Sequence, residues 1–181
     1  MGFVAASFVG GIALGLATKP GSVPIYIGAM LIAIALVLLI DSRVQFGKAV
    51  LWGLALWLPA HLIGGLWVVD GEVVYAHWIL KPVVRYDNLV HAFGFGVAGL
   101  ATLEAMRRSV APGSRAVAFL IVWFGGMAIG AVNEIVEWIS TKVQTVNNVG
   151  DFENSMRDLA ANAIGAAVAG WWVARRDQTP V

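Results

Sequence analysis

The sequence predicts an all-α protein: a polytopic integral membrane bundle of about six transmembrane helices, forming a single domain over residues 1–181. Three observations predict this class. Hydrophobic residues make up 59% of the chain and charged residues only 13%, about half of the charged share in soluble domains. The mean hydropathy is +0.79. The apolar residues also gather in six long segments. Together these features exclude a disordered chain and an ordinary soluble domain.

A transmembrane helix needs about 20 apolar residues, and six segments reach or approach this length. They are residues 2–17, 24–40, 48–69, 87–106, 116–140 and 157–174. Residues typical of turns separate the segments, at 19–22, 41–43, 70–71, 112–114 and 147–150. No Lys or Arg precedes the first segment, so we expect a retained helix there and not a cleaved signal peptide.

The distribution of Lys and Arg predicts that both termini lie on the cytoplasmic side of a cell membrane, because basic residues favour that side. Six spans place seven basic residues there and five on the opposite side. The cytoplasmic set is Arg43, Lys48, Arg107, Arg108, Arg115, Arg175 and Arg176. The opposite set is Lys19, Lys81, Arg85, Lys142 and Arg157. Residues 70–86 carry too many charges to span, and we expect them to form a re-entrant or interfacial stretch on the outer face.

Polar residues inside the predicted helices are the strongest functional signal, because ionisable groups within a bilayer are energetically unfavourable unless they are paired or functional. Successive helices run in opposite directions, so these residues fall at one common depth, in the outer half of the bundle. This conclusion holds for either orientation of the chain. The residues are His61, Asp87, His91, Asn133, Glu134, Glu137, Asp158 and Asn162.

Their spacing places them on single helix faces. Asp87 and His91 are separated by four positions, and so are Asp158 and Asn162. Residues three or four positions apart on a helix are neighbours. Each helix therefore presents one polar stripe, which we expect to face the bundle interior.

Inward-facing carboxylates and imidazoles at one level are typical of a divalent metal site in a helix bundle. Oxygen and imidazole donors without sulfur suit zinc, manganese or iron. The expected ligands are His61, Asp87, His91, Glu134 and Asp158. Acid–base catalysis is expected from Glu134, Glu137 and Asp87. Substrate contacts are expected from Tyr86, Asn133, Asp151, Arg157 and Asn162.

A purely structural role is the alternative. Asp87 is able to cap the fourth helix. His91 and Glu137 are able to pair across helices, as polar groups do in membranes. Asp158 is able to complement a helix N-terminus.

Several of these motifs resemble the YjdF-like family of bacterial inner-membrane proteins. The shared pattern comprises His61-Leu-Ile-Gly-Gly65, Tyr86-Asp87-Asn-Leu-Val-His91, Asn133-Glu134-Ile-Val-Glu137-Trp138 and Gly150-Asp151. The final helix motif, Asp158-Leu-Ala-Ala-Asn162-Ala-Ile-Gly165, is similar to a wider VanZ-like pattern. The resemblance covers about His61 to Gly165. It implies an integral membrane protein of the bacterial inner membrane, and the VanZ-like pattern implies a link to the cell envelope.

The chain departs from the family pattern next to the last Asp. Glu153 and Asn154 stand where the family has a Trp-Asp pair, and Arg157 stands where a Trp is common. The resemblance therefore assigns no role to Asn154. Arg157 adds a cation that is able to pair with Asp151, Glu153 or a substrate anion.

Three functions are compatible with the sequence. The first is a membrane-embedded, metal-dependent hydrolase or transferase acting on a lipid or envelope substrate. The second is a small transporter or binding protein for an ion or polar solute, although the apolar inner half offers no continuous polar path. The third is a structural accessory protein. A net charge of +1 excludes nucleic acid as a partner, and the absence of Cys excludes thiolate chemistry.

Overall fold

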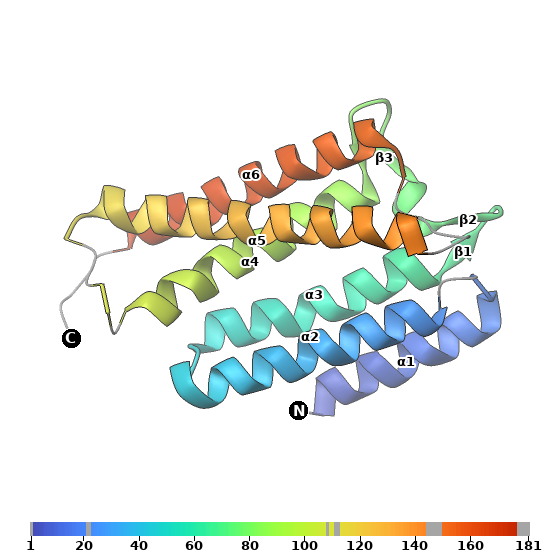
Figure 1. Cartoon of the computed structure of the whole chain (residues 1–181), viewed down its shortest axis with the longest axis horizontal. Coiled ribbons are helices and arrows are strands. Elements are labelled where there is room, and N and C mark those ends of the chain that lie inside the picture. Colours follow the sequence, from blue (N-terminus) through green and yellow to red (C-terminus); the bar gives the residue numbers. More distant parts are fainter. Residues whose placement is uncertain (1, 21–22, 108, 111–112, 144–149, 177–181) are drawn as a thin grey trace.

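The computed structural model describes residues 2–20, 23–107, 109–110, 113–143 and 150–176. Arg108, which contributes to the basic-residue distribution, lies outside the described residues, as do parts of the turns predicted at 19–22, 112–114 and 147–150. In the described part of the chain there are six α-helices, which run back and forth along one direction (Figure 1). They are α1 (Gly2–Thr18), α2 (Val23–Val44), α3 (Lys48–Leu66), α4 (Tyr86–Met106), α5 (Arg115–Val143) and α6 (Phe152–Arg175). The all-α, six-helix prediction is confirmed.

Four of these helices, α2 to α5, are long and apolar enough to cross a membrane by length and composition, and α1 is a shorter apolar helix. The sixth helix, α6, spans 24 residues, which corresponds to a length of about 36 Å. Its sequence is less apolar because it carries Asn154, Asp158 and Asn162. The start of α1 and the end of α6 both point away from the loop that joins α3 to α4 (Figure 1).

Helices α4, α5 and α6 pack closely because small residues let their backbones approach. A Cβ atom built on Gly165 would clash with the Ala92 carbonyl of α4. One built on Gly126 would lie 2.5 Å from the Phe95 carbonyl oxygen. Gly126 and Gly165 therefore serve close helix packing. Leu103, Ala118, Val122 and Val173 fill the apolar core of this three-helix unit.

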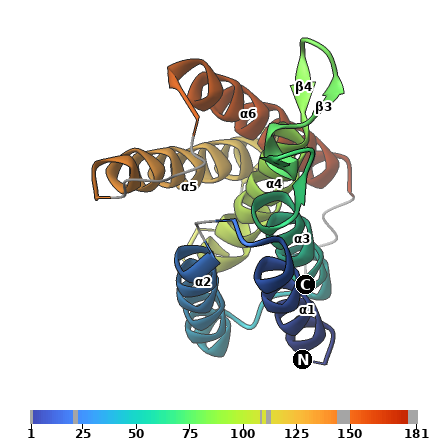
Figure 2. The same cartoon turned by 90° about the vertical axis from the view of Figure 1, so that its right-hand side faces the viewer.

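The remaining helices form a second group beside α4. Viewed from one end of the bundle, α4 lies between α3 on one side and α5 and α6 on the other (Figure 2). Met30, Leu58, Leu62 and Leu66 form the apolar core of this group. Gly11 of α1 lies directly against Leu62 of α3. Within this group, α3 is the helix that packs against α4.

Two short β-hairpins connect α3 to α4. In the first, β1 (Val68–Val69) pairs antiparallel with β2 (Glu72–Val73). Asp70 and Gly71 turn the chain with φ of 52° and 85°, as two-residue hairpin turns require. In the second hairpin, β3 (Trp78–Leu80) pairs with β4 (Val84–Arg85), and a 3₁₀ turn, η1 (Val74–Ala76), joins the two. Both hairpins cover one end of the bundle (Figure 1), which we call the hairpin end.

Several predicted boundaries are wrong. The turn predicted at residues 41–43 lies inside α2, which continues to Val44. The third apolar segment does not remain helical to residue 69, because Val68 and Val69 pair with the next strand. The sixth helix begins at Phe152 and not at 157, because the Asp151 carboxylate accepts a hydrogen bond from the Asn154 backbone (3.0 Å) and caps the helix earlier. The earlier start adds Asn154 to the face that carries Asp158 and Asn162.

Candidate functional site

Helices α4, α5 and α6 bring a set of polar side chains together inside the bundle, near its hairpin end. Asp87 and His91 belong to the first turns of α4, and Asp158 belongs to the second turn of α6. Glu134 and Glu137 come from the last third of α5. We call the full set the polar layer: Asp87, Asn88, His91, Asn133, Glu134, Glu137, Asn154, Asp158 and Asn162.

His91 is the centre of the polar layer and is 7% exposed. Its Nε2 atom lies 3.5 Å from Asp87 Oδ1. On the other edge of the ring, Nδ1 lies 3.1 Å from Asn162 Oδ1 and 3.7 Å from Glu134 Oε1. The amide oxygen of Asn162 is an acceptor only, so Nδ1–H is the donor in this hydrogen bond. In the neutral imidazole, Nε2 then presents its lone pair toward Asp87.

Asp158 is fully buried and is held by two amides. Asn88 Nδ2 donates to Asp158 Oδ1 at 2.8 Å, and Asn154 Nδ2 donates to Asp158 Oδ2 at 2.6 Å. The same Asn154 amide nitrogen lies 3.4 Å from Asp87 Oδ2. The two amides therefore fix the orientation of one carboxylate and reach a second one.

Glu134 has the least satisfied polar side chain of the layer. It is 8% exposed, and neither of its buried carboxylate oxygens accepts a hydrogen bond within the described part of the chain. Ser155 and Asn133 lie nearby, but no side chain in the described part of the chain meets hydrogen-bond geometry with Glu134. The Asn133 amide donates to Glu137 Oε1 at 2.7 Å instead. A buried carboxylate without a donor is energetically unfavourable, so Glu134 is open to an additional positively charged or protonated partner.

Two triads of side chains come close enough to hold one ion each, and they share His91. One is Asp87, His91 and Asp158, and the other is His91, Glu134 and Glu137. Within each triad the candidate ligand atoms lie within 4.8 Å of one another. Four of the five expected ligands thus fall in these triads: Asp87, His91, Glu134 and Asp158.

His61 is the expected ligand that belongs to neither triad. It lies in α3, where its ring stacks on Trp57 at a centroid distance of 4.7 Å. The Tyr75 hydroxyl contacts His61 Nδ1. Burial raises the pKa of Tyr75 well above its usual value of 10, so the hydroxyl keeps its proton. It is therefore the donor in the hydrogen bond to Nδ1. These contacts make His61 part of an aromatic wall beside the layer.

The expected substrate-binding residues divide into two groups. Asn133 and Asn162 lie inside the polar layer, where they bond to Glu137 and His91. The other three lie around it. Tyr86 donates its hydroxyl to the Ala60 carbonyl, Asp151 caps α6, and Arg157 pairs with Glu153 at 3.2 Å.

Four residues that build the site do not follow from the sequence patterns. They are Asn88, Asn154, Tyr75 and Arg85. Arg85 donates from one terminal guanidinium nitrogen to Asn154 Oδ1 at 3.1 Å and places its guanidinium 4.6 Å from the centre of the Trp78 ring. A usable signal existed for Asn154, because it stands four positions before Asp158. No comparable spacing identifies Tyr75, whose position depends on the hairpins.

Comparison with known proteins gives one family match. No curated protein and no solved structure was found to match the chain. A family described as "Predicted membrane protein (DUF2238)" matches residues 1–179, which is nearly the whole sequence and includes every helix described above. The chain therefore belongs to the DUF2238 family of membrane proteins.

Proposed function

We propose that the polar layer binds one divalent metal ion through Asp87, His91 and Asp158, and that the protein is a membrane-embedded hydrolase or transferase. Zinc, manganese and iron suit two carboxylates and one imidazole. Three protein ligands leave a coordination position for water or substrate, as in catalytic metal sites. The substrate is an amphiphile of the membrane or cell envelope that reaches the layer from the hairpin end.

The observation that carries this proposal is the separation of His91 Nε2 and Asp87 Oδ1. The two atoms lie 3.5 Å apart, which is beyond the usual N–H···O range of about 2.7–3.2 Å. A tetrahedral ion with bonds of about 2.1 Å places neighbouring ligand atoms roughly 3.4 Å apart. This separation fits two ligands of a shared ion better than a direct hydrogen bond.

The groups around the triad support the same assignment. A metal-bound histidine usually donates its second ring N–H to a fixed acceptor, and bound carboxylates are themselves hydrogen-bonded. His91 has such an acceptor in Asn162 Oδ1. Asp158 has Asn88 and Asn154 as donors. These three amides orient the ligands.

A divalent ion supplies Lewis acidity and lowers the pKa of water held beside it. Glu134 is the group we propose as proton acceptor, because its buried oxygens have no donor within the described residues. Glu137, held by Asn133, completes the second triad and is able to relay that proton. Asp87 serves as a ligand in this scheme and not as a separate acid or base.

Packing beyond the layer favours a static site over a transport path. On the side away from the hairpins, α4 approaches α5 and α6 at backbone distance, and a Cβ on Gly99 would clash with the Val122 carbonyl.

The YjdF-like resemblance adds the bacterial inner membrane as the proposed location. The VanZ-like resemblance adds an envelope substrate to the proposal.

Elemental analysis of the purified full-length chain tests the proposal. Purified without chelator, the protein should hold about one equivalent of transition metal. His91→Gln and Asp158→Asn should lose it. His77→Gln is the matched control, because His77 lies in the hairpin segment and bonds to the Val69 carbonyl. His61→Gln should keep the metal, since Tyr75 occupies its Nδ1.

Two outcomes would contradict the proposal. One is a protein without metal that also fails to take up zinc, manganese or iron on titration. The other is equal metal content in the wild type and the His91→Gln variant. If both variants lowered thermal stability without any effect on metal content, the layer would serve only to join the helices.

A further inference from the structure

The second hairpin borders a cavity outside the polar layer. The cavity has a volume of about 650 Å³. It lies at the hairpin end of the bundle. Its lining residues are Glu72, Ala76, His77, Trp78, Lys81 and Arg85.

The lining of the cavity carries more positive than negative charge, with Lys81 and Arg85 against Glu72. Lys81 is exposed, and it has no ion-pair partner among the described residues. The Nε atom of Arg85 is buried and makes no hydrogen bond in the described part of the chain. Glu72 is the one acid in the lining. A ligand with a net negative charge would pair with Lys81 and Arg85, which both line the cavity.

The hairpin around the cavity has the composition of a membrane interface. Ile79, Leu80 and Val83 are 58%, 61% and 64% exposed, although each is apolar. Trp78 lies beside them, and it stacks against the guanidinium groups of Arg85 and Arg157 at 4.6 and 5.1 Å. Tryptophan and basic residues concentrate at the level of lipid headgroups. An exposed apolar tip of this kind suits contact with acyl chains, and the neighbouring Trp and basic residues suit headgroup level.

Arg85 connects this cavity to the polar layer. Arg85 lines the cavity, and its guanidinium donates to Asn154. Asn154 in turn donates to Asp158 and reaches Asp87. A headgroup bound at Arg85 is thus one residue away from two proposed metal ligands.

We propose that this cavity binds the headgroup of an anionic lipid from the membrane leaflet at the hairpin end. The inference rests on the proposed function, because it names the substrate class of the same site. Its chemistry is recognition of a phosphate with a net negative charge by Arg85 and Lys81, with the acyl chains lying along Ile79, Leu80 and Val83. Catalysis at the polar layer would then act on a lipid held by its headgroup.

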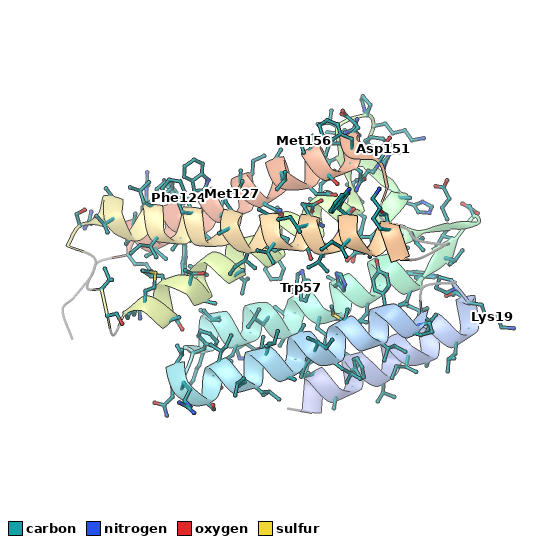
Figure 3. All side chains as sticks on the ribbon, viewed as in Figure 1. Lys19, Trp57, Phe124, Met127, Asp151 and Met156 are labelled. Carbon is teal, nitrogen blue, oxygen red and sulfur yellow. The ribbon has the colours of Figure 1, made fainter. Side chains whose placement is uncertain are left out.

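Native mass spectrometry of the full-length chain in detergent, titrated with short-chain lipids, tests this inference. The protein is treated with chelator, so that headgroup binding is measured independently of metal. Phosphatidylglycerol should bind at least about fivefold more tightly than phosphatidylcholine with the same acyl chains. Lys81→Gln should remove about that factor. Lys19→Gln is the matched control, since Lys19 lies at the same end of the bundle, away from the second hairpin (Figure 3).

Equal affinity for the two lipids would overturn the inference, and so would equal losses in the Lys81→Gln and Lys19→Gln variants. Inorganic phosphate that displaces phosphatidylglycerol at equal concentration would assign the cavity to a free anion and overturn the lipid assignment. The outcome is separable from that of the metal experiment. Selective lipid binding by a protein that never holds metal would support the headgroup site and contradict only the proposed catalysis.

Discussion

Asn88 of α4 and Asp158 of α6 are joined by a hydrogen bond of 2.8 Å between two buried side chains. Seventy positions separate the two residues, so this bond ties the entry of α4 to the entry of α6. The backbone N–H of Arg85 donates in turn to Asn88 Oδ1 at 2.8 Å. Asn88 thus links the end of the second hairpin to the polar layer.

Replacing Asn88 by Ala should lower the free energy of unfolding by about 1–3 kcal/mol, because one oxygen of a buried carboxylate loses its donor. Thermal unfolding of the purified protein in detergent measures the change. Leu89→Ala is the control on the same helix turn, since Leu89 is 49% exposed on the outside of the bundle. Equal losses in the two variants would contradict the assigned role of Asn88.

Replacing Asp151 by Ala should destabilise the protein by about 1 kcal/mol, because α6 loses its N-cap. Asp151→Ser should restore most of the loss, since Ser is also a good N-cap. Glu153→Ala should cost less, because Glu153 is 67% exposed in its pair with Arg157 and exposed ion pairs contribute little. If Glu153→Ala were the more harmful change in thermal unfolding, the capping argument would be wrong.

Replacing Gly130 by Ala should disturb the polar layer through Asn162. A Cβ atom on Gly130 would lie 2.5 Å from Asn162 Nδ2, so the amide that orients His91 must move. We expect a loss of about 1–3 kcal/mol in stability and a weaker metal affinity. Gly10→Ala is the control, because nothing lies within 4 Å of a Cβ built there. Unchanged metal content in Gly130→Ala would separate Asn162 from the proposed metal site.

Replacing Tyr75 by Phe should remove the donor to His61 Nδ1 and shift the ¹⁵N resonances of that ring. Stability should fall by about 1 kcal/mol. Because folding raises the Tyr75 pKa above 10, the stabilisation that this hydroxyl gives is constant at lower pH. It is lost only as the pH rises above about 10 toward the folded-state pKa. A stability difference between the wild type and Tyr75→Phe that varied from about pH 6 to 9 would contradict this assignment.

The polar layer was predictable because two simple rules act together on it. Antiparallel helices return polar residues to one depth, and a spacing of four positions keeps Asp87 with His91 and Asp158 with Asn162. Both rules depend only on helix geometry. For the same reason, the level of His61 followed from the sequence. The contacts that His61 makes with neighbouring helices depend on how α3 is rotated about its axis, so they did not follow from the sequence.

The hairpins could not be predicted because their strands are two or three residues long. Alternation of polar and apolar residues needs about four residues to be recognised. Asn154 was missed for a related reason. With α6 expected to begin at residue 157, its one-turn relation to Asp158 was hidden, although Asp151 is a strong capping residue.

The polar character of α6 makes its insertion into the membrane depend on the helices that it packs against. Helices α4 and α5 qualify as spans by their own composition, whereas α6 does not among the described residues. Asp158, in the second turn of α6, is unfavourable in an isolated helix in lipid, and its partner Asn88 is on α4. Stable insertion of α6 therefore requires that α4 and α5 be in place, and integration of α6 and completion of the polar layer are one event.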